Sequence, residues 1–197
     1  MNLRRSMTAL LALFAALMIA PAVPASAAPV VGGTLKFGWR GVEFFAAPGI
    51  ANDLHGFTSA AGTLTVYDTN RDIVIHPDAA YYYQCIKQTG PTIIVICKFN
   101  SYLFFQLGDG NDRIKIDGPV PVSVQGGTGN DQLDANGQTA PAALRGQQGD
   151  DKVWGGAADD YLDVGEGDRT KQSVVDYFTG TDTCKGAFDY SVGCDLF

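Results

Sequence analysis

Glutamate is nearly absent from this chain. Of the 21 acidic residues among its 197, 19 are Asp and only 2 are Glu. An acidic helical protein would be rich in Glu, because Asp forms helices poorly and prefers turns and caps. The 24 glycines fit the same interpretation, since Gly also favours turns. This composition predicts many tight turns, or carboxylate ligands carried on loops.

Charged residues in general, and basic ones in particular, are also scarce. Only 18% of the residues are charged whereas 46% are hydrophobic, a balance that argues against wholesale disorder. Lys and Arg together number 14, and the formal net charge is −7. Binding to phosphates needs clustered Lys and Arg, so nucleic acid is not expected as a partner. The length suits one ordinary domain.

No hydrophobic run is long enough to cross a membrane. The longest, ALLALFAALMIA at residues 9–20, is shorter than the roughly 20 apolar residues that a bilayer requires. Arg4 and Arg5 precede it, and Ala25 and Ala27 follow in PAVPASA, with the spacing of a cleavage site. Residues 1–27 are therefore predicted to be a secretory signal peptide, the alternative being a retained membrane anchor. The mature protein is expected to be secreted and extracellular, without stable membrane insertion.

Four cysteines are present, and none of them forms the CxxC unit that zinc sites usually contain. In an oxidising compartment they are expected to form two disulfides, for which three pairings are possible. The simplest pairing joins sequence neighbours, Cys85 with Cys97 and Cys184 with Cys194.

The motifs of several large enzyme classes are missing. The chain contains no GxSxG, HExxH or GxxxxGK[ST] sequence, and its only histidines are His55 and His76. The pairs Asp150–Asp151 and Asp159–Asp160 could mimic a catalytic carboxylate dyad. Adjacent residues on an extended chain point apart, however. The chain is therefore expected not to be an enzyme.

The first part of the mature chain, residues 28–106, reads as β structure. Thr34 to Leu107 holds 13 of the 21 aromatic residues in short runs such as GTLTVYD and PTIIVICKF, separated by Gly, Pro, Asn or Asp. Such runs suit half-buried strands. The cluster Tyr81–Tyr82–Tyr83 is interpreted as part of a core or edge strand, the alternative being a platform on which sugars stack.

A repeat begins at Leu107. Four segments follow the pattern G-G-x-G-x-D-x-U-x, where U is a large apolar residue: LGDGNDRIK (107–115), GGTGNDQLD (126–134), GQQGDDKVW (146–154) and GGAADDYLD (155–163). The second matches all five fixed positions and each of the others matches four. The sixth-position aspartates are spaced by 19, 20 and 9 residues, which suggests two nonapeptides per coil. The repeat is the strongest signal in the sequence.

These motifs resemble the hemolysin-type, or RTX, calcium-binding repeat family, and more narrowly the small secreted calcium-binding proteins of Gram-positive bacteria. The resemblance implies a right-handed parallel β-roll over residues 107–170, in which six residues of each nonapeptide turn around calcium and three form a strand. RTX toxins and proteases usually carry a retained C-terminal export signal. The cleavable N-terminal signal expected here argues against those two classes.

The residue types support calcium independently, because calcium takes six to eight oxygen ligands from carboxylates and backbone carbonyls. Stacked coils would bring the sixth-position aspartates into one column, and only cations would offset their repulsion. Asp160 lies on the back side without a clear stacked partner. The alternative is that the Asp-Gly turns are ordinary corners without metal. The candidate metal-site residues are Gly108, Gly110, Asp112, Gly127, Gly129, Asp131, Gly149, Asp151, Asp160 and Asp168.

Two substitutions weaken the pattern. Gln147 replaces the second Gly of its repeat and Ala158 replaces the fourth-position Gly of another. A left-handed backbone at either position would cost roughly 1–2 kcal/mol.

The sequence as a whole predicts an all-β protein. An aromatic-rich N-terminal β region leads into the calcium-binding β-roll, and a disulfide-tied cap at residues 171–197 covers the open end, because exposed strand edges need cover. The expected function is binding of Ca²⁺ that holds the roll together. The alternative is an extracellular adhesion or carbohydrate-binding module, with a protein or glycan partner and calcium in a supporting role.

Overall fold

The fold was obtained as a computed structural model that describes residues 30–39, 41–99, 101–167, 173–175, 180–186, 190–192 and 194. The expected signal peptide, residues 1–27, and the candidate ligand Asp168 lie outside the described residues. Much of the expected cap lies outside them as well.

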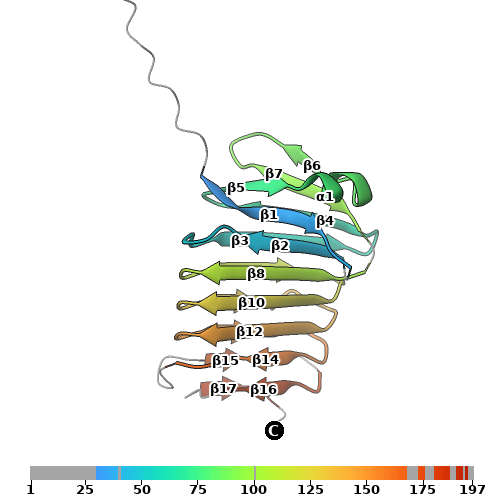
Figure 1. The fold of residues 1–197 in the computed structure, drawn as a ribbon. Coiled ribbons are helices and arrows are strands. Elements are labelled where there is room, and N and C mark those ends of the chain that lie inside the picture. Colours follow the sequence, from blue (N-terminus) through green and yellow to red (C-terminus); the bar gives the residue numbers. More distant parts are fainter. Residues whose placement is uncertain are drawn as a thin grey trace, which may run out of the picture.

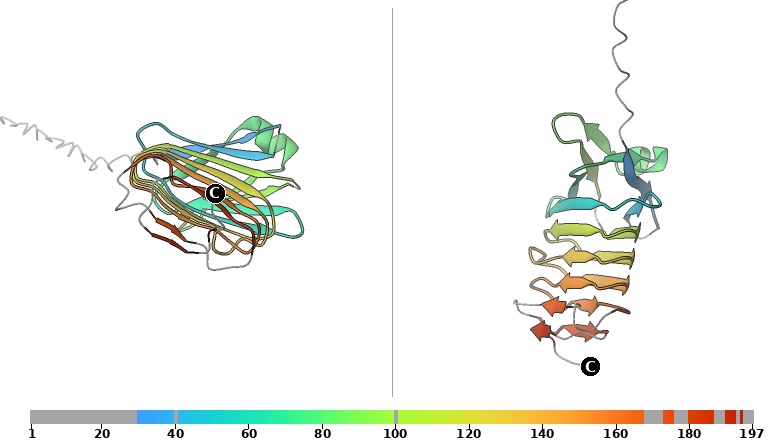
Figure 2. Two further views of the ribbon diagram at one scale, coloured as in Figure 1. Left: turned by 90° about the horizontal axis from the view of Figure 1, so that it is seen from below. Right: turned by 90° about the vertical axis from the view of Figure 1, so that its left-hand side faces the viewer.

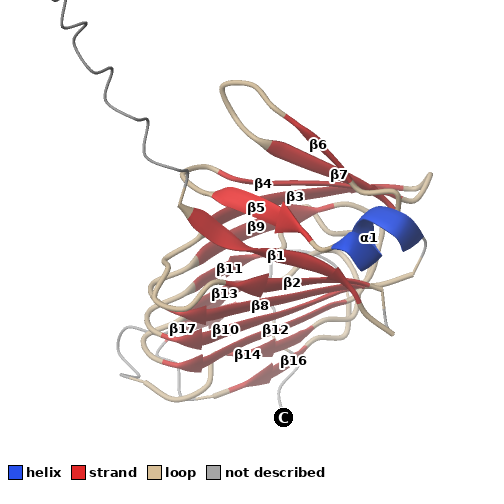
Figure 3. Ribbon diagram, turned by 45° about the horizontal axis from the view of Figure 1, so that its top comes forward, coloured by secondary structure: helices blue, strands red, loops and turns tan. Residues whose placement is uncertain are grey.

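The described residues form two β-sheets and one short helix, α1 (Pro77–Tyr82), which confirms the prediction of an all-β protein (Figures 1 and 3). The first sheet contains, in spatial order, β16 (Thr183–Lys185), β14 (Tyr161–Asp163), β12 (Ala142–Gln148), β10 (Val122–Thr128), β8 (Leu103–Asp109), β2 (Val42–Ala46), β1 (Val31–Phe37) and β5 (Asp72–Ile75). The second contains β17 (Tyr190–Val192), β15 (Ser173–Val175), β13 (Lys152–Trp154), β11 (Gln132–Asp134), β9 (Arg113–Asp117), β3 (Asp53–Ser59), β4 (Thr63–Asp68), β7 (Ile94–Lys98) and β6 (Ile86–Gln88).

From β8 onward the chain passes alternately between the two sheets. Each strand pairs in parallel with the strand two elements later. One stack therefore contains β8, β10, β12, β14 and β16, and the other contains β9, β11, β13, β15 and β17. We call one strand of the first sheet and the next strand of the second sheet a coil. The first coil is β8–β9, the second β10–β11, the third β12–β13 and the fourth β14–β15. Figure 2 shows these coils stacked along one axis.

The two kinds of turn between the sheets lie at opposite edges of the stack. We call the turns from the first sheet to the second the front corner, residues 110–112, 129–131 and 149–151. The turns back to the first sheet form the back corner, residues 118–121, 135–141 and 155–160. Similar side chains in successive coils therefore form columns at each corner.

The N-terminal region shares both sheets with the repeats. β2 pairs in parallel with β8, and β3 with β9, so these two strands form one further coil above the first. Beyond them most pairs are antiparallel, namely β1–β2, β3–β4, β4–β7 and β6–β7, whereas β1 and β5 pair in parallel. The expected boundary between residues 106 and 107 falls inside β8, because the strand that leads into the first repeat starts at Leu103.

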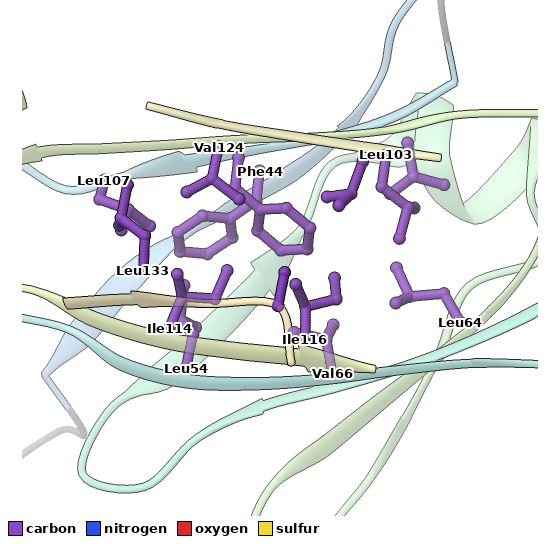
Figure 4. Packing of buried hydrophobic residues seen from close by; sticks show 14 of the residues in the cluster. Phe44, Leu54, Leu64, Val66, Leu103, Leu107, Ile114, Ile116, Val124 and Leu133 are labelled. Carbon is purple, nitrogen blue, oxygen red and sulfur yellow. The ribbon is translucent and has the colours of Figure 1, made fainter. Parts of the chain in front are cut away.

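The hydrophobic core lies between the sheets, where alternate residues of each strand point inward. Phe44 and Phe105 meet at its centre with ring centroids 6.0 Å apart, surrounded by aliphatic side chains from both sheets (Figure 4). The core becomes thinner toward the C-terminus. Five apolar residues are buried in the first coil, Leu103, Phe105, Leu107, Ile114 and Ile116, whereas the third coil buries Ala142, Leu144 and Val153.

The structure corrects the prediction for the tyrosine cluster. Tyr81 and Tyr82 lie in α1, not in a core or edge strand, and their exposed fractions are 78% and 60%. The helix begins there because Pro77 occupies its first turn and Nδ1 of His76 accepts a hydrogen bond from the backbone N–H of Asp78. These local signals outweigh the β propensity of three consecutive tyrosines.

Both expected disulfides are present, Cys85–Cys97 and Cys184–Cys194. The first ties the segment after α1 to β7, and the second involves β16. In the described part of the chain no helix is long and apolar enough to cross a bilayer.

Candidate calcium-binding site

Three of the predicted aspartates form a column at the front corner. Asp112, Asp131 and Asp151 each stand directly before a strand of the second sheet, and the register pairs the residues that follow them, Arg113, Gln132 and Lys152. All three side chains are at most 2% exposed. Because of this parallel register, aspartates that are 19 or 20 residues apart in the sequence lie in adjacent coils, one strand spacing apart.

Hydrogen bonds from the backbone hold this column in place. The N–H of Asp112 donates to Oδ1 of Asp131, and the N–H of Asp131 donates to Oδ1 of Asp151, both at 2.8 Å. The residues one position earlier bond in the opposite direction, because the N–H of Asn130 donates to Oδ1 of Asn111, and that of Asp150 to Oδ1 of Asn130, again at 2.8 Å. The first and second coils are therefore joined twice at this corner, and so are the second and third.

The second carboxylate oxygen of each column residue has no such partner. Oδ2 of Asp112, Asp131 and Asp151 is buried and accepts no hydrogen bond. The ion pairs among the described residues join His55 to Asp53, His76 to Asp78 and Lys87 to Asp72, and none reaches the column. A buried carboxylate without a counter-charge is costly, so these oxygens fit a bound cation.

Burial also changes the acidity of the column. It raises the pKa of Asp112 and Asp151 to about 7 and that of Asp131 to about 6, from an ordinary value of 3.8. The charge of Asp131 raises the pKa of its two neighbours further. Without a metal ion, protons therefore stay bound to these groups at a higher pH than they would on exposed aspartates.

Glycine is required at two places around the column. Gly110, Gly129 and Gly149 have φ values of 130°, 125° and 132°, and a Cβ on Gly129 would collide with the carbonyl oxygen of Gly110. Gly126 and Gly146 lie beside Oδ2 of Asp131 and Asp151, where a Cβ would collide with those oxygens. In the second group, the absence of a side chain lets the unpartnered oxygens lie directly against the backbone of the strand that precedes the turn.

The second-position residues Gly108 and Gly127 have positive φ values of 89° and 120°, and Gln147, at the same position of the next coil, has φ 81°. The concern about Gln147 is therefore justified. Ala158 differs, because Gln84 and Gln147 are the non-glycine residues with positive φ in the described part of the chain. Ala158 belongs to a back-corner turn, whose backbone does not follow the front-corner path.

Asp160 lies apart from the column. It is in the back corner, where its Oδ1 accepts from the N–H of Ala142 and its Oδ2 from the N–H of Gly156. Its own N–H donates to Oδ1 of Asp182 at 2.8 Å. Asp160 does have a stacked partner, contrary to expectation, and the structure gives both of its oxygens backbone donors, unlike those of the front column.

Two residues that lie in these columns were not predicted from the sequence. Asp182 stands in GTDTCK, a shortened copy of the repeat that begins at its fourth position. Asn52 stands above Asp112 in the additional coil, donating its N–H to Oδ1 of Asp112 at 2.6 Å and its amide to Asp68 and Gly32. No repeat surrounds Asn52, so only the sheet register could reveal it.

The candidate residues can be grouped by what the structure brings together. Gly108, Gly110, Gly127, Gly129 and Gly149 line the front-corner turns beside Asp112, Asp131 and Asp151, whereas Asp160 lies at the opposite edge. Within the described ranges no three His, Cys, Asp or Glu side chains gather around one point. An ion at the front corner would therefore need backbone carbonyl oxygens in addition to the aspartates.

The strain at Gln147 can be tested by substitution. Gln147→Gly should stabilise the protein by about 0.5–1 kcal/mol. The substitution removes the cost of a left-handed backbone at a residue with a Cβ, and this gain is larger than the extra backbone entropy that glycine loses on folding. Gln148→Gly is the matched control, since Gln148 is also exposed but has no positive φ. It should destabilise the protein. Chemical denaturation of both variants in saturating calcium measures the difference, and equal effects would contradict the assignment of strain.

Comparison with known proteins adds one match. The family model described as the RTX calcium-binding nonapeptide repeat fits four copies, at residues 123–139 and 143–170. This stretch includes Asp131, Asp151 and Asp160 but not the segment around Asp112. No curated protein and no solved structure matches the chain. Residues 123–139 and 143–170 therefore belong to the family of RTX calcium-binding nonapeptide repeats.

Proposed function

We propose that this is a secreted calcium-binding protein in which calcium ions at the front corner hold together a right-handed β-roll. One observation carries this proposal: three buried aspartates stand in a column, and each has one carboxylate oxygen tied to the backbone and one without any partner. Binding alone explains these features, and the proposed function includes no catalytic step.

The charges of the column favour a cation over water as the missing partner. Neighbouring coils stand about 4.8 Å apart, and unit charges at that distance repel each other strongly once they are removed from bulk water. Asp131 has a like charge on both sides. Water would hydrate these oxygens without removing the repulsion, whereas divalent cations between them would convert it into attraction.

The donor set favours calcium among the divalent cations. Carboxylates and backbone carbonyls are hard oxygen ligands, and the column contains no His or Cys, which zinc prefers. Two calcium–oxygen distances of about 2.4 Å together match one strand spacing. Magnesium needs shorter distances and a stricter octahedron, and it gives up its water reluctantly.

Calcium binding and folding of the later coils should be closely coupled. The third coil buries only Ala142, Leu144 and Val153, so hydrophobic burial is smallest where the RTX repeats lie. Metal binding supplies folding free energy when the site does not exist in the unfolded chain. The two disulfides fit an oxidising, extracellular location. Calcium levels there are high enough for weak sites to fill.

Hydrogen exchange during a calcium titration tests this function. Amides of residues 122–167 should gain protection as calcium rises through about 10⁻⁴–10⁻³ M, the usual range of extracellular modules. Magnesium should have much less effect. The region around Phe44 and Phe105 should remain protected throughout, because its core does not depend on metal. Equal protection of residues 122–167 in metal-free protein would rule out the proposed role of calcium.

Two matched variants assign the effect to the column. Asp131→Asn removes the charge at its centre and should weaken calcium binding at least tenfold. Asp160→Asn removes a charge that is buried to a similar degree at the back corner, where both oxygens already have donors, and should change calcium affinity little. A larger loss for Asp160→Asn would show that the ions bind at the back corner instead.

The raised pKa values predict opposite pH effects with and without calcium. In metal-free protein the folded state binds more protons than the unfolded state between about pH 4 and pH 7, because the pKa values of Asp112, Asp131 and Asp151 are raised above 3.8. Stability should therefore fall as pH rises through this window. Calcium requires ionised carboxylates, so its affinity should rise over the same window. Thermal unfolding of dialysed and calcium-loaded protein at pH 5 and pH 8 tests both, and a metal-free protein more stable at pH 8 would contradict this account.

The second candidate function is recognition of a glycan or protein through the N-terminal end. Phe37, Trp39, Tyr81 and Tyr82 are large and exposed there, and the ring of Phe37 lies 4.5 Å from that of Tyr82. Exposed aromatic rings are suitable surfaces for sugar rings or apolar side chains.

The double variant Tyr81→Ala/Tyr82→Ala separates this candidate from calcium binding. If the aromatic end recognises a glycan, this variant should lose retention on insoluble polysaccharides such as cellulose, chitin or peptidoglycan while it binds calcium normally. Tyr67→Ala is the control, because Tyr67 stacks on His55 instead. Wild-type protein that is not retained on any of them, or variants retained equally well, would count against glycan recognition.

A further inference from the structure

The back corner between the first and second coils contains polar atoms that the front column does not use. Asp117 ends β9, and Asn136 and Gln138 lie in the turn that follows β11. Oδ1 of Asp117, Oδ1 of Asn136 and Oε1 of Gln138 are all buried and have no hydrogen-bond partner. Gln138 is completely buried, with an exposed fraction of 0%. None of the three residues stands at the sixth position of a repeat.

The three residues belong to turns that lie directly against each other. A parallel bridge pairs Gly118, the residue after Asp117, with Gln138. The N–H of Gly118 donates to the carbonyl of Gly137, and the N–H of Thr139 donates to the carbonyl of Gly118, both at 3.0 Å. A Cβ on Gly137 would collide with Oδ1 of Asp117. The orphan oxygen of Asp117 therefore touches the residue between Asn136 and Gln138.

Proline explains why these oxygens lack donors. Pro119 and Pro121 follow Asp117, and Pro141 follows Gln138, and proline has no backbone N–H. At the front corner each Oδ1 is satisfied by an N–H of the neighbouring coil. In these two back-corner turns three potential backbone donors are missing, so the oxygens need a partner from outside the chain.

We propose that this back corner binds a divalent cation of calcium's class through Asp117, Asn136 and Gln138. One carboxylate and two amide carbonyls form a hard, all-oxygen donor set, which suits calcium. The Nε2 group of Gln138 also lacks a partner, and a water bound to the ion would accept its hydrogen bond. The ion would join the turn before β10 to the turn before β12 at the edge opposite the front column.

This site should be weaker than those of the front column. Only one carboxylate contributes to it, whereas each gap of the column lies between two, and calcium affinity rises with the charge of the ligands. The site is additional to the proposed function, because none of its residues belongs to the column.

Native mass spectrometry of the mature protein during a calcium titration tests the site. Asp117→Asn should bind one ion fewer than the wild type at millimolar calcium, or bind the weakest ion at least tenfold less tightly. Asp163→Asn is the matched control, because Asp163 is a half-buried strand-end aspartate whose oxygens accept from Gly165 and Tyr161. It should bind as many ions as the wild type.

Two further variants, Gln138→Glu and Asp131→Asn, distinguish this site from the front column. Gln138→Glu adds a carboxylate at nearly constant volume and should tighten the weakest site. If it does not, and if Asp117→Asn behaves like Asp163→Asn, the back corner holds buried water only and the inference is overturned. Loss of ions in Asp131→Asn but not in Asp117→Asn would leave the front column intact as a calcium site. Loss in Asp117→Asn alone would instead overturn the proposed function of the column.

Discussion

Parallel coils one strand spacing apart force equivalent side chains into columns, and at the front corner that column consists of buried carboxylates. Asp112, Asp131 and Asp151 lie closer together than unpaired charges tolerate in a protein interior. The surrounding structure accommodates them in two ways. Backbone N–H groups of the adjacent coil satisfy one oxygen of each. Glycines let the second oxygen of Asp131 and Asp151 lie directly against the backbone.

In the middle coils, glycine stands at a position where the other coils bury an apolar side chain. The inward position at the end of the first-sheet strand is Leu107 in the first coil, Gly126 and Gly146 in the next two, and Val164 in the fourth. At both glycines, a carboxylate oxygen of the column occupies the place where a side chain would begin. The middle coils thus give up apolar burial for a charged site. Above them lie the ring contact of Phe44 with Phe105 and the Cys85–Cys97 disulfide, in the part of the protein that we propose does not depend on metal.

The sequence was most informative where chemistry and spacing coincide. Asp112, Asp131 and Asp151 could be placed in one column because their glycine-rich contexts repeat at 19 and 20 residues. Asn52 and Asp117 could not be found in this way, since their positions depend on which strands pair, and no local motif marks that pairing. Tyr81 and Tyr82 were misplaced because a six-residue helix leaves little periodicity to detect. Its start was encoded only in His76, Pro77 and Asp78.

The hydrogen bonds between neighbouring coils at the front corner form without an ion. Oδ1 of Asp131 and Oδ1 of Asp151 already bond to the coil above, and Asn111 and Asn130 bond to the coil below. These contacts fix the register between coils without any ion. The register in turn places successive aspartates of the column one strand spacing apart. Under the proposed function, the chain itself specifies where the ions would bind, and the ions would determine whether the charged coils are stable in that arrangement.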